Sequence, residues 1–368
     1  MENRVLLSVI IPVHNGAKFI RKTVHELMKQ TLSDFEIILV ENHSDDDSYA
    51  LCRKLSDKEP RIKLLQSSEK GTSMARRLGV ENAEGVYTVF SDQDDHYIDN
   101  KALEEMVRLI SDDETDICQF SYYKEYLPFA RRKIEYTDER KVFTEEQIRK
   151  RHIIGVFGAK GCFFDTTVWS KIYRTDLLKE AVSHVHEELY YAEDEYLNIW
   201  AFSSPLLNSV SVRNEAFYCW KTTTGFSSSS SNGEALLRDY EIVKPLAEEV
   251  ALKSKNIMVI SYVHTEAINC FLAIFMDMIK RKVPEETVLS KIDTYNNYQF
   301  MIKAKQYIRE HPFLIRMWPD RKFLSSDYTA KEYYDYCLSQ LDFEKQNRKG
   351  IYKAKLQKLK TVKLFNEK

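Results

Sequence analysis

The sequence of 368 residues predicts an α/β fold, in which a mostly parallel β-sheet carries helices on both faces and a helical C-terminal domain follows. Three observations predict this fold. Strand-like and helix-like segments alternate through the first third of the chain. The strand-like segments are continuous apolar runs, which are typical of strands buried on both faces of a sheet. From about Glu234 onward the apolar residues recur with helical spacing.

The predicted elements of the first third follow one another in strict alternation. Runs of Ile, Leu and Val mark the strands, and apolar residues three or four positions apart mark the helices. The predicted strands span 6–13, 35–40, 62–65, 86–90 and 117–122, and the predicted helices span 18–30, 48–56, 72–83 and 103–110. Residues 123–232 are less regular, and Pro284-Glu285-Glu286 has the composition of a helix start, with Pro at the first position.

The composition indicates a protein with a buried core and little net charge. Hydrophobic residues make up 43% of the chain and the formal net charge is −2, so no global field points to a nucleic-acid partner. The six cysteines form no C-x-x-C pair, which disfavours a zinc knot and fits a reducing, cytoplasmic setting. We recognise no signal-peptide pattern after Met1. The apolar run 257–279 contains His264, Glu266 and Asn269, which favours a buried or amphipathic helix over a membrane span.

Polar residues gather where three predicted strands end, in the segments 13–16, 41–47 and 91–95. In open parallel sheets, ligands bind beyond the carboxyl ends of the strands. The third segment contains Asp92-Gln93-Asp94-Asp95, whose crowded carboxylates repel one another unless a cation compensates them. Mg²⁺ and Mn²⁺ prefer oxygen ligands of this kind, often together with substrate phosphates. A helix cap with solvated aspartates is the alternative interpretation.

Several motifs in the same order along the chain resemble the family 2 glycosyltransferases of GT-A fold, over about 190 residues. The matching segments are Ser8–Asn15, Phe35–Val40, Glu41–Asp46, Gly71 with Ala75–Gly79, Asp92–Asp95, Trp169–Arg174 and Glu193-Asp194. Three positions depart from the family pattern. His14 stands where Tyr is usual, Glu41 where Asp is commoner, and Arg77 where Asn is usual.

The resemblance implies a role for the matched residues. Those expected to bind the nucleotide-sugar donor are Pro12, Val13, Asn15, Glu41, Arg76, Asp92 and Gln93. Among them, Glu41 would accept a hydrogen bond from the base, commonly uracil, and Arg76 would lie near the base or the pyrophosphate. Asp92 would contact the ribose or the metal. Asp94 would bind Mn²⁺ or Mg²⁺, and Asp194 would be the general base of an inverting transfer.

Other residues are open to two interpretations. Glu193, Trp220 and Lys221 are candidate contacts to the acceptor or to phosphate, although a helix start, packing or a surface position explains them as well. Trp169 and Tyr173 also suit a role as core aromatics.

Three histidines raise the question of further metal ligands. His96 directly follows the aspartates and is either a loop residue or an aid to metal or phosphate binding. His184 and His186 would share one face of a strand, but no third ligand accompanies them at a suitable spacing.

The resemblance divides the chain into a GT-A domain at 1–235 and a helical domain at 236–368. Residues 1–122 would bind the nucleotide sugar and the metal, and residues 123–235 would form the acceptor half. The serine run Ser227–Ser231 would act as a lid over the bound donor.

The helical domain is open to three roles. It could shape the acceptor site, form a homodimer, or contact the inner face of the cell membrane through its basic tail at 345–368. A solvated basic helix end is the simpler interpretation of that tail.

The predicted function is transfer of a hexose from a nucleotide-diphosphate sugar, with UDP expected, to a hydroxyl of a growing glycan, polysaccharide or lipid-linked saccharide. A nucleotidyltransferase-like sugar-nucleotide enzyme is one alternative. Such an enzyme needs a Gly-rich basic loop after the first strand, and His14–Lys18 matches that loop poorly. A non-catalytic scaffold that binds nucleotide sugars is another. The sequence lacks the motifs of P-loop NTPases, dinucleotide oxidoreductases and α/β-hydrolases.

Overall fold

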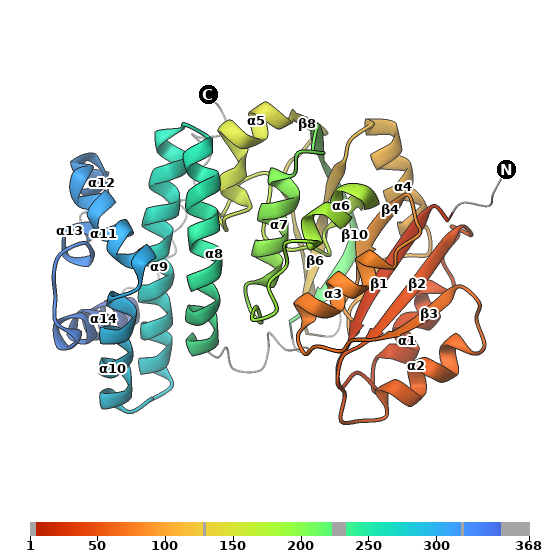
Figure 1. Cartoon of the computed structure of the whole chain (residues 1–368), viewed down its shortest axis with the longest axis horizontal. Coiled ribbons are helices and arrows are strands. Elements are labelled where there is room, and N and C mark those ends of the chain that lie inside the picture. Colours follow the sequence, from red (N-terminus) through yellow and green to blue (C-terminus); the bar gives the residue numbers. More distant parts are fainter. Residues whose placement is uncertain (1–4, 128–129, 223–232, 318–319, 347–368) are drawn as a thin grey trace. The chain divides into compact units, whose positions relative to one another are not determined.

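The computed structural model describes residues 5–127, 130–222, 233–317 and 320–346 (Figure 1). Contacts divide the chain into two compact units: residues 1–148 with 163–231, and residues 149–162 with 232–368. The serine run Ser227–Ser231 and nearly all of the basic tail lie outside the described residues, so the lid and the membrane contact stay predictions.

The first unit is built on a ten-stranded sheet. Eight of its strands have the order β3-β2-β1-β4-β9-β6-β10-β5, and the other two, β7 and β8, pair with β6 and β10 respectively. The strands are β1 (Leu7–Val13), β2 (Phe35–Glu41), β3 (Ile62–Gln66), β4 (Tyr87–Phe90), β5 (His96–Tyr97), β6 (Ile117–Leu127), β7 (Ala130–Ile134), β8 (Lys141–Thr144), β9 (Lys171–Arg174) and β10 (Ser209–Lys221).

The first four strands are parallel, as predicted, and the later strands make the sheet mixed. β1 pairs with β2 and β4, and β2 with β3, all in parallel. β9 runs antiparallel to both β4 and β6. Every residue of β2 is buried, in keeping with its central run of Ile, Leu and Val. Apart from the two-residue β5, the antiparallel strands come from residues after 123, where the sequence pattern is irregular.

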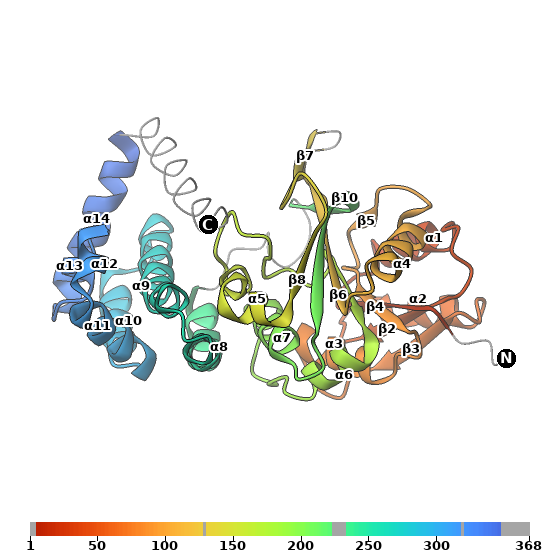
Figure 2. The ribbon, with the colours of Figure 1, turned by 90° about the horizontal axis from the view of Figure 1, so that it is seen from above.

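Helices cover both faces of this sheet, so the predicted α/β fold is confirmed. Figure 2 shows α3, α6 and α7 on one side of the sheet and α1 and α4 on the other, and the first three also pack against one another. The helices of the unit are α1 (Ile20–Leu27), α2 (Ser48–Ser56), α3 (Thr72–Glu81), α4 (Ala102–Asp113), α5 (Glu145–Lys150, at the division between the units), α6 (Thr175–Val182) and α7 (Glu193–Ser203).

The second unit is helical, as the spacing after residue 234 predicts. Its helices are η1 (His152–Gly155), α8 (Gly233–Lys253), α9 (Ile257–Lys280), α10 (Glu285–Asn296), α11 (Gln299–Glu310), α12 (Pro312–Met317), α13 (Arg321–Leu324) and α14 (Ala330–Gln346). Its core contains an aromatic cluster in which Phe271 lies edge-on to Phe275, Tyr295 and Tyr333.

Among the described helices, α9 has the length and hydropathy of a membrane span. Half of its most apolar window is buried within the structure. Core helices of other proteins reach the same length and hydropathy, so these two properties are weak evidence for a membrane span. His264 on this helix is buried and stacks on Tyr307 of α11, so this polar residue lies in the packed interior of the unit.

The helix start at Pro284-Glu285-Glu286 is confirmed, with both acids in the first turn of α10. Pro284 is the N-cap residue rather than the first helical residue, because its ψ of 136° is extended. The prediction for two histidines is wrong. His184 and His186 follow α6 in a turn rather than a strand. His184 bonds to Glu180 and stacks on Trp200, so the two imidazoles do not share a strand face.

Candidate active site

The predicted donor-binding segments meet at one edge of the sheet. Val13 and Glu41 are opposite each other at the ends of the parallel strands β1 and β2. Phe90, at the end of β4, is opposite Ile10 of β1 and leads directly into the aspartate turn. Three strand ends therefore deliver their loops to the same place, as expected for an open sheet with a ligand site.

The loop after β1 is fixed to the aspartate turn through Gln93. The side-chain amide of Gln93 accepts a hydrogen bond from His14 N (3.1 Å) and donates one to His14 O (2.8 Å). A Cβ atom at Gly16 would lie 2.0 Å from Gln93 Oε1, so glycine leaves the room that this pairing needs. Gln93 thus orients the loop, a role that its place between two aspartates does not reveal.

Asn15 holds the second loop in position. It adopts a left-handed φ of 49°, a conformation that Asn tolerates better than most residues. Its Oδ1 accepts a hydrogen bond from Asp45 N (2.8 Å), and its own N–H donates to Ser44 Oγ (3.1 Å). Glu41, which is buried, accepts from Ser44 N at 2.6 Å. Pro12 is partly buried and Val13 fully buried beside this loop.

The start of α3 is fixed by an amide-to-backbone pair. Asn42 Nδ2 donates to Gly71 O (2.7 Å), and Gly71 N donates to Asn42 Oδ1 (3.1 Å). Gly71 has a φ of 117° and a ψ of 144°, a region that residues with a Cβ rarely enter. The pair places the first turns of α3, and with them Arg76, beside the end of β2.

Arg76 is the centre of an acidic cluster. Its side chain is almost fully buried, and its guanidinium pairs with Asp92 (3.5 Å), with Glu193 (3.2 Å) and most closely with Asp194. The guanidinium carbon also lies 5.7 Å from the ring centre of Phe90. The two acidic motifs that the sequence singled out therefore meet at one cation.

Burial and crowding change the protonation of this cluster. Burial raises the pKa of the Glu193 carboxyl to about 8; the charge of Asp194 adds to the rise, and Arg76 opposes it. Burial also raises the pKa of Asp92 to about 6, again against the charge of Arg76. Burial alone would lower the pKa of Arg76, but the carboxylates around it raise the value instead. Arg76 therefore stays charged and Glu193 holds a proton at neutral pH.

Tyr218 and Lys221 of β10 fix the aspartate turn. The hydroxyl of Tyr218 accepts a hydrogen bond from Asp92 N (2.8 Å). Lys221 N donates to Asp95 Oδ1 (2.8 Å), and Lys221 Nζ donates to Asp94 O (2.6 Å). Burial, followed by the charge of Asp92, raises the pKa of Asp95 well above its usual value. Lys221, a candidate phosphate contact, lies in this structure against the backbone of the turn.

The segment before β9 positions Asp194. Val168 N donates to Asp194 Oδ2 (3.4 Å). Asn198 Nδ2, one helical turn later on α7, donates to Asp194 O (3.0 Å) and to Thr166 O (2.7 Å). The buried ammonium of Lys171 donates to Asp165 Oδ1 at 2.9 Å and so closes the same loop. The loop and the helix start therefore hold Asp194 from two sides.

An aromatic cluster lies beside the turn. Trp169 stacks on Tyr218 with ring centres 5.0 Å apart, and lies 6.0 Å from Trp220. Lys124 Nζ lies 4.3 Å from the Trp220 ring centre. Trp169 is buried, and Tyr173 is fully buried with its hydroxyl donating to Asn198 (2.9 Å). Trp169 and Tyr173 are therefore core aromatics, whereas Trp220 is partly exposed.

The aspartate turn has the donor set of a hard divalent cation. The carboxylate of Asp94 makes no hydrogen bond or ion pair with the described part of the chain, where only its backbone oxygen is bonded. Asp95 Oδ2 is buried and likewise has no partner there. Unpaired carboxylate oxygens in one tight turn fit Mg²⁺ or Mn²⁺. Residues 92–95 do not suit a soft metal, because all of their side-chain ligand atoms are oxygens or amide nitrogens, with no sulfur or imidazole among them.

Sequence reasoning missed Tyr218, Asn198 and Lys171 as residues that hold the site. Lys171 belongs to the Trp169–Arg174 motif, but the motif does not reveal that its ammonium binds Asp165. Tyr218 follows no local pattern, because its contact with Asp92 spans 126 positions.

Comparison with known proteins supports the resemblance to this family. Residues 8–172 match the family model described as glycosyl transferase family 2. That stretch includes β1 to β4, the aspartate turn and Arg76. This region of the chain is similar to glycosyl transferase family 2. The resemblance carried by the sequence motifs is confirmed, and the early acidic motif lies inside the family region, whereas Glu193 and Asp194 lie beyond it.

Relatives with a curated description are glycosyltransferases by name. The chain is 27% identical over 223 residues to the uncharacterized glycosyltransferase EpsJ of Bacillus subtilis, covering 59% of this chain and 61% of that protein. It is 25% identical over 258 residues to the poly(ribitol-phosphate) beta-N-acetylglucosaminyltransferase TarS of Staphylococcus aureus, covering 66% of this chain and 40% of TarS. The match thus spans less than two thirds of either relative.

Solved structures support the fold. The crystal structure of S. aureus TarS 1–349 in complex with UDP is similar with a TM-score of 0.55 and 18% sequence identity, over 83% of this chain and 92% of that one. The GT-A fold that the motifs imply is therefore confirmed.

Proposed function

We propose that this protein transfers a sugar from a nucleoside-diphosphate sugar to an acceptor hydroxyl on a glycan or polysaccharide. The observation that carries the proposal is the contact of Arg76 with Asp92 on one side and with Glu193 and Asp194 on the other. This contact brings the Asp92–Asp95 turn, which suits a diphosphate and a cation, next to Asp194, whose carboxylate suits a general base. The family of residues 8–172 supports the same reaction class.

The charge balance of the site supports dependence on a divalent cation. Asp92, Asp94, Asp95 and Asp194 crowd one edge of the sheet, where Arg76 is buried as their counter-charge. A donor diphosphate adds further negative charge to this edge, which the guanidinium of Arg76 and the ammonium of Lys221 together do not neutralise. When bound at Asp94, Mg²⁺ or Mn²⁺ supplies positive charge to the departing nucleoside diphosphate. Asp92 and Gln93 would orient the donor next to that residue.

Asp194 is the proposed general base. Attack by the acceptor hydroxyl on the face opposite the leaving group requires a carboxylate to take its proton and gives inversion. Val168 N and Asn198 hold Asp194 in place, and Glu193 keeps its own proton at neutral pH. In this structure the carboxylate of Asp194 is ion-paired with Arg76. A bound diphosphate would compete for the same guanidinium and free the carboxylate to accept a proton.

A uridine nucleotide and a hexose are the proposed donor components. The uridine part rests on TarS, whose structures hold UDP and UDP-GlcNAc, and on the proposed base contact of Glu41. The hexose part follows from the N-acetylglucosaminyl transfer named for TarS. A saccharide is the proposed acceptor; TarS is named for a poly(ribitol-phosphate) acceptor, and EpsJ is named only as a glycosyltransferase.

The experiment is a donor screen with the full chain. Purified protein is mixed with single nucleotide sugars, Mn²⁺ or Mg²⁺ and a saccharide mixture, and the nucleotide product is identified. We expect release of a nucleoside diphosphate from a UDP-sugar, loss of that release with a chelator, and loss in Asp94→Asn. Release of pyrophosphate would identify a nucleotidyltransferase. Donor binding without any turnover across the screen would indicate a scaffold and overturn the proposal.

A further inference from the structure

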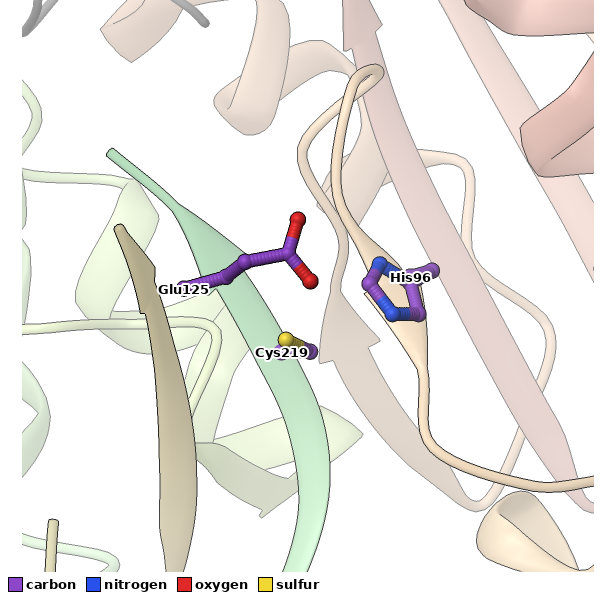
Figure 3. A group of neighbouring side chains, drawn as sticks. All are labelled: His96, Glu125 and Cys219. Atoms are coloured by element: carbon purple, nitrogen blue, oxygen red, sulfur yellow. The ribbon is translucent and has the colours of Figure 1, made fainter. Parts of the chain in front are cut away.

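Three metal-ligating side chains converge on the face of the sheet next to the aspartate turn. His96, Glu125 and Cys219 each offer a ligand atom, and these atoms lie within 4.8 Å of one another. Figure 3 shows the imidazole, the carboxylate and the thiol pointing toward one another from three strands. None of the three has a part in the transfer proposed above.

Strand register explains the convergence. Cys219 of β10 is the antiparallel partner of His96 of β5. Lys221, two residues after Cys219 and on the same face, is the parallel partner of Glu125 of β6. The three side chains therefore share one face. Tyr218 and Trp220, on either side of Cys219 in the sequence, point to the other face and join the aromatic cluster of Trp169.

The imidazole, the carboxylate and the thiol lack the hydrogen-bond or ion-pair partners that such groups usually have. Within the described residues, His96 Nδ1 is buried without a hydrogen bond. The Glu125 carboxylate forms no hydrogen bond or ion pair with that part of the chain. Cys219 is a free thiol with no exposed surface. Polar groups inside a folded protein are nearly always paired. Cys219 and His96 Nδ1 are buried and Glu125 is partly buried, so these three neighbouring groups call for a common partner.

We propose that His96, Glu125 and Cys219 bind a zinc-type transition-metal ion, with water as the fourth ligand. A thiolate, an imidazole and a carboxylate together form a donor set that zinc accepts, and three protein ligands with water complete its tetrahedral shell. This site differs in chemistry from the Asp94 turn, whose oxygen donors suit Mg²⁺ or Mn²⁺.

The position of the site gives the ion a structural effect. His96 directly follows Asp95, and Cys219 lies two residues before Lys221, which bonds to both Asp94 and Asp95. An ion on His96, Glu125 and Cys219 ties β5, β6 and β10 together beside that turn. Bound zinc thereby stabilises the strands that hold the aspartates.

The test is a titration of the full chain with Co²⁺ and with Zn²⁺, without any nucleotide. Co²⁺ bound to a thiolate gives a sulfur-to-metal absorption band, which oxygen ligands do not give. We expect this band in the wild-type chain and in Asp94→Asn, which separates the site from the proposed catalytic cation. Cys270→Ser, which removes a thiol from α9, is the matched control and should keep the band.

Two ligand variants decide the outcome. Cys219→Ser should abolish the cobalt–thiolate band. Glu125→Gln, which keeps the shape of the side chain, should weaken Zn²⁺ binding at least about tenfold. Circular dichroism confirms that each variant is folded, and Glu125→Gln decides the matter if Cys219→Ser is not. The proposal is overturned if the wild type gives no thiolate band, or if Glu125→Gln binds Zn²⁺ as tightly as Cys270→Ser does.

Discussion

Arg76 connects two acidic motifs that lie more than a hundred positions apart in the sequence. It reaches Asp92 at the end of β4 and Glu193 and Asp194 at the start of α7, the latter pair 117 and 118 positions further along the chain. Because the guanidinium is buried, its charge is poorly screened by solvent, and its removal leaves carboxylates without compensation.

Arg76→Gln is expected to lower the free energy of unfolding by about 3–5 kcal/mol, since it breaks a buried ion-pair cluster. Equilibrium urea unfolding measures this change. Arg77→Gln is the matched control: it is the next residue on α3, it is half exposed, and its pair with Glu81 should contribute about 0.5 kcal/mol or less. Equal losses in the two variants would contradict the assigned role of Arg76.

Glu193 gives the stability a pH dependence. Its pKa is 4.5 in an unfolded chain and about 8 in the folded protein, so the folded state holds the extra proton between these values. The stabilisation is fully present below about pH 4.5 and is lost as the pH rises to about 8. Glu193→Gln should remove this decline, and the difference between the two unfolding curves over that pH range isolates it. A parallel decline in both proteins would exclude Glu193 as its source.

At the scale of elements, the start of α3 decides where Arg76 lies. Gly71, with its φ of 117°, pairs with Asn42 and sets the first turn of the helix. The loop 165–168 sets Asp194 in the same way, through Lys171 and Asn198. Backbone geometry in two short loops thus determines the distance between the acidic motifs.

Gly71→Ala is expected to destabilise the protein by about 1–3 kcal/mol, because a residue with a Cβ is strained at this φ and ψ. Thermal unfolding measures the loss, and transfer activity should fall with it, since α3 carries Arg76. Lys70→Ala changes the preceding, exposed residue and should leave stability within about 0.5 kcal/mol. A Gly71→Ala protein as stable as Lys70→Ala would show that the turn is not strained.

The sequence predicted the local features of this site and not their long-range partners. The strands up to β4 and the Asp92–Asp95 turn could be predicted, because apolar runs and an acidic cluster are continuous in sequence. The contacts of Tyr218 could not, since they depend on how β10 pairs with its neighbours. Which strands run antiparallel could not be predicted for the same reason: antiparallel pairing of β9 leaves no mark in its four residues.

His96 illustrates the limit further. Its neighbours Asp94 and Asp95 suggested a link to the metal or to phosphate, whereas the strand register of β5 brings it to Cys219 and Glu125. No spacing rule joins three ligands from three separate strands, so the scattered cysteines gave no indication of a metal site.

At the scale of the whole molecule, each of the two units has its own buried core. The sheet unit holds the proposed catalytic residues, and the helical unit is organised around Phe271 and the rings beside it. The segment 149–162, which the sequence places with the acceptor half, packs with the helical unit. Shaping of the acceptor site by the helices and formation of a homodimer stay predictions.

Phe271→Ala should lower the stability of the helical unit by about 3–5 kcal/mol, because it empties the centre of an aromatic cluster. Hydrogen exchange resolves the effect by element, and we expect faster exchange in α9, α10 and α14. The control is Phe343→Ala on α14, where the ring is 55% exposed, with a change within about 0.5 kcal/mol. Unchanged exchange in α9 would contradict the assignment of this core.

The most direct test of the proposed transfer is the turnover of Asp194→Asn with the donor that the screen identifies. We predict that donor affinity stays within about threefold of the wild type, while the rate of nucleoside-diphosphate release falls by about 10²- to 10⁴-fold, as expected for loss of a general base. Asp112→Asn, on the exposed face of α4, should release the product at the wild-type rate. Wild-type turnover in Asp194→Asn would contradict the account.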